Sequence, residues 1–370
     1  MICSPAYNSI SHTSCLNPGM NSGGNEAKVQ RKPTMIDVAR LAGVGSMTVS
    51  RVLSGSANVS AEAAQRVHKA IAQLNYRPNE LARALRGQRS KSIGFILPYL
   101  YDPFFALCAH AVTTAARQHG YSVIMTTSNE DPEIEYTEAT QMLQRHVEGL
   151  ILIPANRGQS RLNRALLGKT PMVAFDRPLA DPAYDTVLVQ NQSGARRMVQ
   201  HLIEHGHKEI AFMGLGRNLF TINARYQGYR RAMMDAGLKT DAFFECDTQD
   251  STLDAIEERM RSKTPPTAFF TSNTLATRYV FAALLQLGVH IPGQAALAGF
   301  DDFELADITA PPLTVVRQPA QEMGRVAACQ LFERLERGET PQTGNRIVLP
   351  VELVLRRSCG CKHKTPVVMQ

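Results

Sequence analysis

The sequence predicts a small helical module at the N-terminus, followed by a larger α/β body with two lobes. Its 370 residues are too many for one ordinary domain and enough for two or three. From residue 93 onward, short apolar runs alternate with helical stretches, as they do in α/β proteins. The excess positive charge lies almost entirely before that point, which separates the two parts by composition as well as by pattern.

Positive charge is concentrated in residues 31–91, where eleven Lys and Arg side chains accompany only three Asp and Glu. This segment carries a net charge of +8, whereas the whole chain carries +7. Because the rest of the chain is close to neutral, the asymmetry predicts a polyanionic partner for the N-terminal module alone.

Residues 1–32 are rich in Ser, Asn, Gly and Pro without periodicity, and we expect a disordered tail there. They contain neither a basic start nor a continuous apolar stretch, so no secretory signal is expected. No run of about 18 apolar residues occurs, so no membrane span is expected. The seven cysteines are scattered and odd in number, which argues against a disulfide scaffold and favours a cytoplasmic location.

The basic module is predicted to contain three short helices. Thr34 is a good N-cap with Asp37 three residues on, and Gly43 can end the first helix. A second helix is expected from about Ser46 to Leu53 and a third from about Ala61 to Asn75, before Pro78 breaks the chain.

The first two of these helices have helix-turn-helix spacing. Ala39 is small enough for close helix contact, Gly43 can form the turn, and Val49 can close the small core. Any two-helix hairpin could show the same three residues, but the local charge of +8 favours the DNA-binding interpretation.

The body is predicted to hold parallel sheets with helices on both faces, because strands and helices alternate. The runs expected as strands are Ile93–Leu97, Ser122–Thr126, Gly149–Ile153, Met172–Phe175, Thr186–Val189, Ile210–Met213, Ala268–Thr271 and Ala296–Phe300. The helical stretches between them are Ala106–His119, Glu133–Arg145, Gly194–His205, Tyr226–Ala236, Thr252–Arg261 and Thr274–Leu287. These are too many strands for one sheet, so we expect two doubly wound lobes with a ligand pocket in the cleft between them.

Together, these motifs resemble those of the lactose/galactose-repressor (LacI/GalR) family of bacterial transcription regulators. The stretch from Thr34 to Leu53 is similar to the family's DNA-binding headpiece. The match continues through Val59-Ser60, Asn75-Tyr76-x-Pro78-Asn79, Leu81-Ala82-x-x-Leu85 and later motifs from Ile93-Gly94 to Pro350. It covers about residues 34–357 and implies a periplasmic-binding-protein-like body behind the headpiece.

The following domain limits are expected. A disordered tail (1–32) precedes the headpiece (33–78), the hinge helix and linker (79–91), an effector-binding and dimerisation domain (92–357) and a flexible tail (358–370). The first lobe is expected to contain about 92–190 plus 319–345, and the second about 191–316 plus 346–357.

The resemblance implies that the second helix enters the major groove. Ser46 and Met47 then stand where the family reads operator bases, and Met47 offers only apolar contact, for instance to a thymine methyl. Arg51 is the expected hydrogen-bonding reader, because its guanidinium suits guanine O6 and N7. Phosphate contact or helix positioning is expected of the remaining polar residues, namely Thr48, Ser50, Asn58 and Ser60. Gly45 departs from the family's usual Ser, which implies the loss of one phosphate contact.

Asn79–Arg86 resembles the family's hinge helix, and Asn79 is counted among the expected DNA contacts. Two such helices pair in the minor groove in the family, and Leu85 occupies the place of the leucine that wedges between base pairs. Packing of Leu85 against the body is the alternative. Because so short a helix is marginal alone, its folding can be coupled to dimer geometry and thereby to an effector.

The resemblance also implies an effector site in the cleft. Carried over residue by residue, it comprises Asp102, Phe104, Phe105, Asp176, Arg177, Arg225, Asn273, Asp301 and Gln318. Carboxylates accept hydrogen bonds from hydroxyls, arginine and amide groups donate to them, and aromatic rings cover C–H faces, so this set suits a sugar and resembles aldose pockets. Purine, acidic-sugar and phosphosugar effectors acting as corepressors are the alternatives.

Two departures and two simpler interpretations bear on this site. Asp102 stands where aldose pockets often have Asn, and Thr274 stands where the family usually has Asp. Asp176 could instead cap a helix, and Arg225 could pair with a surface carboxylate.

An enzyme and a free transport protein are the competing interpretations. No Gly-x-Ser-x-Gly elbow, phosphate-binding loop or His-Glu-x-x-His motif occurs, so no catalytic residues are assigned. A transport protein would carry a secretory signal and would lack the basic headpiece. Cys359, Cys361 and His363 lack four-ligand spacing in an expected solvated tail, so neither a metal site nor a cofactor is predicted.

The sequence therefore predicts a cytoplasmic, nucleoid-associated transcriptional repressor of carbohydrate-utilisation genes. It is expected to bind a palindromic double-stranded operator as a homodimer and to respond to a sugar, with no membrane partner. A tetramer is not expected, because the C-terminal residues show no leucine heptad.

Overall fold

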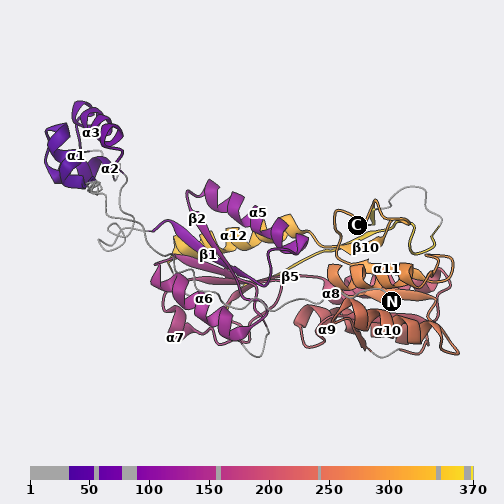
Figure 1. Cartoon of the computed structure of the whole chain (residues 1–370). Coiled ribbons are helices and arrows are strands. Elements are labelled where there is room, and N and C mark those ends of the chain that lie inside the picture. The colour runs from indigo at the N-terminus through magenta and orange to yellow at the C-terminus, as the bar shows by residue number, and fades with distance from the viewer. Residues whose placement is uncertain are drawn as a thin grey trace, which may run out of the picture. The chain divides into compact units, whose positions relative to one another are not determined.

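The computed structural model describes residues 33–53, 58–76, 90–155, 160–240, 243–338, 343–361 and 368–369 (Figure 1). These residues belong to two compact units, 33–76 and 90–369, and each is described by itself. The expected tail 1–32 and most of the expected hinge segment lie outside the described residues. None of the described helices is long and apolar enough to cross a membrane.

The first unit consists of the three expected helices, α1 (Met35–Ala42), α2 (Ser46–Leu53) and α3 (Ala61–Leu74). At the start of α1, Asp37 N donates to Thr34 Oγ1, and Asp37 Oδ2 accepts from Thr34 N at 2.8 Å, so the two residues form a capping box.

A small apolar core confirms the helix-turn-helix expected from the spacing. Gly43 ends α1 with φ +62°, a left-handed conformation that glycine adopts without steric cost. Ala39 and Val49 are both buried, and Val38 and Val67 join them in one apolar cluster. The turn and the close helix contact therefore depend on the three residues that the spacing singled out.

The first lobe of the second unit is built on a parallel six-stranded sheet with the order β11-β5-β4-β3-β1-β2. Its strands are β1 (Ser92–Leu97), β2 (Ser122–Thr127), β3 (Gly149–Leu152), β4 (Met172–Phe175), β5 (Asp185–Val189) and β11 (Arg346–Leu349). The apolar clusters place α5 (Pro103–Gln118) and α12 (Ala320–Arg337) on one face, and α6 (Pro132–Gln144) and α7 (Arg164–Leu167) on the other.

The second lobe is built on a seven-stranded sheet with the order β13-β12-β10-β9-β8-β6-β7. Its strands are β6 (Ile210–Gly214), β7 (Phe243–Glu245), β8 (Ala268–Thr271), β9 (Ala296–Phe300), β10 (Thr314–Arg317), β12 (Glu352–Val354) and β13 (Val368–Met369). Helices α8 (Asn191–Glu204) and α9 (Phe220–Asp235) cover one face, and α10 (Gln249–Met260) and α11 (Thr274–Gln286) cover the other. Among the described strands, β12 pairs in antiparallel fashion with both β10 and β13, and the other pairs of this sheet are parallel.

All eight strands expected from the sequence are present, with ends that differ by at most one residue. Most are buried along their whole length, and such strands appear in the sequence as continuous apolar runs. The two doubly wound lobes are therefore confirmed.

The expected limits of the lobes are wrong at one crossing. Residues 346–349 form β11, which pairs in parallel with β5 of the first lobe. The chain therefore returns to the edge of the first sheet after α12 and crosses to the second lobe only after Leu349.

The expectation of a flexible tail from residue 358 is also wrong for its first residues. Ser358 and Cys359 are completely buried, and Cys361 is 7% exposed. Ser358 Oγ accepts from Thr314 N at 2.8 Å and donates to Leu297 O at 2.5 Å. Because this hydroxyl joins the segment to β9 and to β10, residues 358–361 are part of the second lobe.

One glycine allows the close contact between α8 and α9. A Cβ atom at Gly228 would lie only 2.2 Å from the carbonyl oxygen of Gln192 on α8. The two helices therefore approach each other at this point, which also fixes Arg225, one turn earlier on α9.

Candidate functional site

A cavity of about 450 Å³ lies between the two lobes, at the carboxyl ends of strands from both sheets. It is lined by all nine residues that the sequence predicted to bind an effector, namely Asp102, Phe104, Phe105, Asp176, Arg177, Arg225, Asn273, Asp301 and Gln318. Residues from distant parts of the chain therefore meet where an open α/β sheet places its ligands.

Two of the lining aspartates occupy equivalent places in the two lobes. Asp176 follows β4 with φ +63°, and Asp301 follows β9 with φ +77°. Their amides donate to Val187 O at 2.9 Å and Val316 O at 2.8 Å, so each residue still pairs with the neighbouring strand. The left-handed backbone is an uncommon conformation for a residue other than glycine, and such conformations concentrate at functional sites.

Arg225 is held in place by several groups of the second lobe. Its Nε donates to Asn191 Oδ1 at 2.8 Å, and its Nη1 donates to Ser272 O at 2.6 Å and lies 3.4 Å from Asp301 Oδ2. The guanidinium lies 3.8 Å from the centre of the Phe300 ring. Arg225 is only 3% exposed, so it is not half of a surface ion pair.

Arg177 is held by a carboxylate that the sequence analysis missed. Its Nη1 and Nη2 donate to the two oxygens of Glu130 at 2.5 and 2.7 Å, and Nη1 also donates to the carbonyls of Pro154 and Ala155. Arg177 therefore braces the wall of the cavity with most of its donors. Glu130 follows β2 much as Asp176 follows β4, so its place after an expected strand was the available signal.

Other lining residues were also missed by sequence reasoning, among them Tyr99, Tyr101, Asn218 and Arg278. Tyr99 and Tyr101 stack with their ring centres 5.0 Å apart. They precede Asp102 in the loop after β1, and their aromatic character next to Phe104 was the only sequence signal.

Two of the nine residues also cap helices. Asp102 Oδ1 accepts from Phe104 N at 2.9 Å at the start of α5, and Asn273 Oδ1 accepts from Ala276 N at 2.9 Å at the start of α11. Asp176 caps none of the described helices of the second unit, so the capping role considered for it is wrong for this part of the chain.

Several polar atoms on the cavity wall are buried without a hydrogen-bond partner among the described residues. They are Asp176 Oδ1, Gln318 Oε1, Thr274 Oγ1 and Arg177 Nε. A buried polar atom without a partner costs roughly 1–3 kcal/mol, so such atoms are uncommon unless water or a ligand satisfies them. The wall therefore presents two acceptors, one hydroxyl and one guanidinium donor without a hydrogen-bond partner in the described part of the chain.

Two carboxyl groups of the cavity titrate near pH 6. Burial, followed by repulsion from Asp301, raises the pKa of Asp102 to about 6. Burial also raises the pKa of Asp176 to about 6, although the positive charges of Arg177 and Arg225 act to lower it. The cavity therefore loses negative charge when the pH falls through 6.

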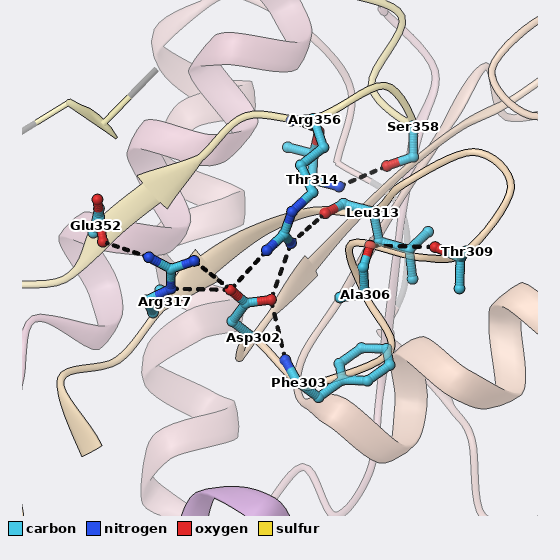
Figure 2. A network of polar contacts seen from close by, with 10 residues as sticks. All are labelled: Asp302, Phe303, Ala306, Thr309, Leu313, Thr314, Arg317, Glu352, Arg356 and Ser358. Atoms are coloured by element: carbon cyan, nitrogen blue, oxygen red, sulfur yellow. Dashed lines mark hydrogen bonds and ion pairs between the residues drawn. The ribbon is translucent and has the colours of Figure 1, made fainter. Parts of the chain in front are cut away.

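A network of ion pairs fixes the loop beside the cavity (Figure 2). Asp302 accepts from Arg317 Nε and from Arg356 Nη1, both at 2.9 Å, and Arg317 Nη1 donates to Glu352 at 3.2 Å. Burial acts to raise the pKa of Asp302, but the two guanidinium groups outweigh it, so the pKa lies below its usual value.

This network positions the residues on the cavity wall next to it in sequence. Asp301 precedes Asp302, and Gln318 follows Arg317. Gln318 Nε2 donates to Asp301 Oδ1 at 2.5 Å, so the two wall residues are also joined directly. Of the two consecutive aspartates, Asp301 lines the cavity, whereas Asp302 forms the ion pairs that hold the neighbouring loop in place.

The residues expected to read DNA lie along α2 and beyond it. Ser46, Met47 and Arg51 are exposed, and Met47 retains 67% of its surface. Met47 and Arg51, four residues apart, lie on one side of α2 opposite buried Val49, and Ser46 is the first residue of the helix. A Cβ at Gly45 would meet nothing within 4 Å, so no packing requirement explains the glycine.

The remaining expected DNA contacts differ in their surroundings. Thr48 and Ser50 are half-buried, whereas Asn58 and Ser60 are exposed. Ser60 Oγ also accepts from Ala63 N as the cap of α3. Asn79 and Leu85 lie outside the described residues.

Family models match both units. The model for bacterial regulatory proteins of the lacI family matches residues 34–79, and the model for periplasmic binding protein-like domains matches residues 199–359. Repressors named HTH-type transcriptional repressor PurR match nearly the whole chain. The PurR of Actinobacillus pleuropneumoniae is 31% identical over 328 residues, which cover 88% of this chain and 98% of that protein. The PurR of Haemophilus influenzae is 32% identical over 332 residues, with the same coverage.

Solved structures of transcription regulators also match this chain over most of its length. The lac repressor dimer bound to operator and the anti-inducer ONPF matches with a TM-score of 0.79 at 26% identity, covering 89% of this chain and 99% of that one. The complex of the transcriptional regulator CelR with cellobiose matches with a TM-score of 0.66 at 30% identity, covering 88% and 99%.

The raised pKa of Asp176 predicts a gain in stability when its charge is removed. Between about pH 4 and pH 6 the folded protein binds the proton more tightly than the unfolded chain, so the carboxyl group lowers stability as the pH rises through this window. We expect the unliganded Asp176→Asn variant to be more stable than the wild type at pH 7.5, by roughly 1–3 kcal/mol. The gain should shrink as the pH falls from 6 toward 4. Urea unfolding at pH 7.5 and pH 4.5 measures both effects.

Asn tolerates the left-handed backbone of position 176, so the substitution changes the charge with little change in shape. Asp254→Asn on α10 is the matched control, because this aspartate is exposed, and it should change stability at neither pH. A less stable Asp176→Asn protein at pH 7.5 would show instead that Arg177 and Arg225 stabilise the ionised carboxylate.

Proposed function

The chain belongs to the lacI family of bacterial regulatory proteins, and we propose that it represses carbohydrate-utilisation genes under the control of a neutral sugar. Membership makes it a DNA-binding transcriptional repressor with a periplasmic-binding-protein-like body. The class of effector, the residues that contact the operator and the formation of a homodimer are our proposals. The proposal of a sugar effector rests on one observation: buried acceptor oxygens that lack partners among the described residues lie on the cavity wall beside arginine donors that are held in place.

A sugar hydroxyl both donates and accepts, so it suits a wall on which acceptors and donors alternate. Asp176 and Gln318 each offer an unpartnered oxygen, whereas Arg225 offers guanidinium protons close to Asp301. Phe104 provides an aromatic surface for the C–H groups of a pyranose ring. The volume of about 450 Å³ accommodates a mono- or disaccharide.

A purine effector that acts as a corepressor is the second candidate. The relatives named PurR, which match 88% of this chain, favour it. The aromatic residues Tyr99, Tyr101 and Phe104 could also stack on a flat heterocycle. The regulator CelR, which is 30% identical to this chain, is described in complex with cellobiose, and this supports a sugar effector instead.

A thermal-shift screen of the full-length protein separates these effectors. The panel contains neutral aldoses and disaccharides, aldonic acids, phosphosugars and purine bases. A ligand present at about 100 times its Kd stabilises the folded state by roughly 2.7 kcal/mol, which is a readily measured shift. We expect a neutral sugar to shift the wild type and the Asp254→Asn control, and to shift Asp176→Asn much less. If only a purine or a phosphosugar raises the melting temperature, the protein is still a repressor, but the proposal of a neutral-sugar effector is wrong.

We propose that α2 reads the operator through Arg51, with Ser46 and Met47 beside it. All three side chains are exposed, and Met47 and Arg51 lie on the same side of the helix, which supports this role. Thr48, Ser50, Asn58 and Ser60 are proposed to contact phosphates or to position the helix.

Arg51→Ala should remove sequence discrimination. A bidentate arginine–guanine contact contributes about 1–3 kcal/mol, so specific affinity should fall on the order of 10-fold or more. An operator is first selected from random duplexes with the wild-type protein, and fluorescence anisotropy then compares selected and scrambled duplexes at fixed salt. Effector affinity should not change.

Arg66→Ala on α3 is the matched control, because it removes the same charge from an exposed position of the headpiece. We expect it to weaken both duplexes equally. If Arg51→Ala also weakens both duplexes equally, Arg51 contacts only phosphates.

A homodimer is proposed on a face formed by α5 and the loop after β9. A hollow of about 1040 Å³ there is lined by Leu107, Glu304 and Asp307, among others. Exposed apolar residues occur beside these, with Leu305 at 57% and Ile308 at 74% exposure. A two-fold operator requires two headpieces, and the lac repressor in the operator complex is described as a dimer.

Ile308→Asp should weaken this dimer, because it places a charge in an apolar contact. We expect analytical ultracentrifugation to show monomers at micromolar concentrations at which the wild type is dimeric. Met234→Asp is the control, since Met234 is also apolar and 58% exposed but lies on α9. A dimeric Ile308→Asp protein would place the interface on another face.

A further inference from the structure

Three side chains that commonly bind metals are buried together in the second lobe, away from the cavity. His201 lies on α8, and Cys359 and Cys361 lie in the segment that follows β12. Their ligand atoms all lie within 4.8 Å of one another. His201 and Cys361 are each 7% exposed, and Cys359 is completely buried. We propose that these three residues bind a Zn²⁺ ion.

The distances are close to those that a zinc ion imposes. Cys359 Sγ lies 3.0 Å from Cys361 Sγ and 3.4 Å from His201 Nε2. In a tetrahedral site with Zn–S bonds of about 2.3 Å and Zn–N bonds of about 2.0 Å, two sulfurs lie about 3.7 Å apart and a sulfur and a nitrogen about 3.5 Å apart. The distance from Cys359 to His201 already fits, whereas the two sulfurs must move apart by about 0.7 Å for both to bind the ion.

The backbone between the cysteines favours this arrangement. Gly360 has a φ of +78°, a left-handed conformation that glycine adopts readily. This turn reverses the segment locally, so that Cys359 and Cys361 present their sulfurs to the same point although only one residue separates them.

The charge of the site and one of its hydrogen bonds also suit zinc, whereas the bonds that both thiols donate to Arg356 O, at 3.6 and 3.3 Å, are lost when the thiols become thiolates. Two thiolates and a neutral imidazole balance the charge of Zn²⁺, so the site is neutral as a whole and compatible with burial. Thr314 Oγ1 donates to Cys359 Sγ at 3.2 Å while it accepts from Arg356 N at 2.9 Å. An O–H group directed at a sulfur stabilises the thiolate that binds the metal.

The donor set selects the class of metal. Thiolate and imidazole ligands favour Zn²⁺ and similar thiophilic ions over Mg²⁺ or Ca²⁺, which need oxygen ligands. The three residues leave a fourth position for a ligand such as water. His363 lies outside the described residues and forms no part of the proposal. The ion joins the segment 358–361 to α8 and thereby fixes the C-terminal part of the second lobe.

Metal analysis of the full-length protein tests the site. The protein is expressed with zinc in the medium and purified under reducing conditions without chelator, and zinc is measured by mass spectrometry of the elements. We expect about one zinc per chain in the wild type and almost none in Cys361→Ser or His201→Gln. The metal-depleted wild type should develop a thiolate-to-cobalt absorption band when Co²⁺ is added, and both variants should lack it.

Two matched variants serve as controls. His205→Gln changes the C-cap residue of the same helix, whose ring lies 4.2 Å from that of His201, and Cys329→Ser changes a cysteine of α12. Both should retain zinc, and circular dichroism checks that every variant is folded. His201→Gln keeps the test decisive if Cys361→Ser does not fold, since it leaves both cysteines in place.

Three outcomes would overturn the proposal. The first is a wild-type protein that contains no zinc and gives no cobalt band. The second is a zinc content that neither Cys361→Ser nor His201→Gln reduces. The third is a peptide carrying a Cys359–Cys361 disulfide in protein handled without reductant and with zinc present, which would make the pair a redox couple instead.

Discussion

The chain passes between the two lobes three times, and the cavity is built on these passages. They lie between β5 and α8, between β10 and α12, and between β11 and β12. Asn191, which holds Arg225, begins the first passage into the second lobe, and Gln318, which holds Asp301, lies in the second passage. Two of the groups that hold the cavity's polar side chains in place therefore lie at the passages that connect the lobes, whereas Glu130 and Ser272 hold Arg177 and Arg225 from within a single lobe. A movement of one lobe against the other must change the distances among them.

The carboxylate of Asp302 beside the cavity and that of Asp176 on its wall differ in how completely their oxygens are hydrogen-bonded. Asp302 has its carboxylate fully engaged by Arg317 and Arg356, and its pKa lies below the usual value. Asp176, in contrast, has one unpartnered oxygen and a pKa of about 6. Burial of an incompletely bonded carboxylate lowers the stability of the empty protein, and a ligand that bonds to it restores that stability.

Much of the molecule could be predicted from the sequence, because its local signals agree with its tertiary structure. Buried parallel strands appear as apolar runs, and Gly43 marks its turn without any knowledge of the neighbouring helix. The nine cavity residues came from family resemblance, which transmits positions that no local pattern reveals. Glu130 was missed because its role depends on Arg177, which lies 47 residues away. The burial of Cys359 was missed because Ser358 bonds to strands far away in sequence.

The same reasoning explains why the C-terminal limits were misplaced. The strand β11 pairs at a sheet edge and is only partly buried, and its short apolar run Ile347–Leu349 does not indicate which of the two sheets it joins. The segment after β12 has no periodicity at all, and only its contacts with α8 and β10 show that it is folded.

The left-handed backbone at Asp176 and Asp301 limits how this cavity can change during evolution. At such φ values, Asp, Asn and Gly are tolerated, whereas β-branched side chains are strongly disfavoured. A mutation at either position can therefore keep an acceptor, exchange it for an amide or remove it, but it cannot easily introduce an aliphatic wall. New effector preferences in descendants of this chain must arise mainly at positions with ordinary backbone, such as Phe104 and Thr274. The backbone conformation at Asp176 and Asp301 therefore limits the range of ligands that proteins descended from this chain can come to bind.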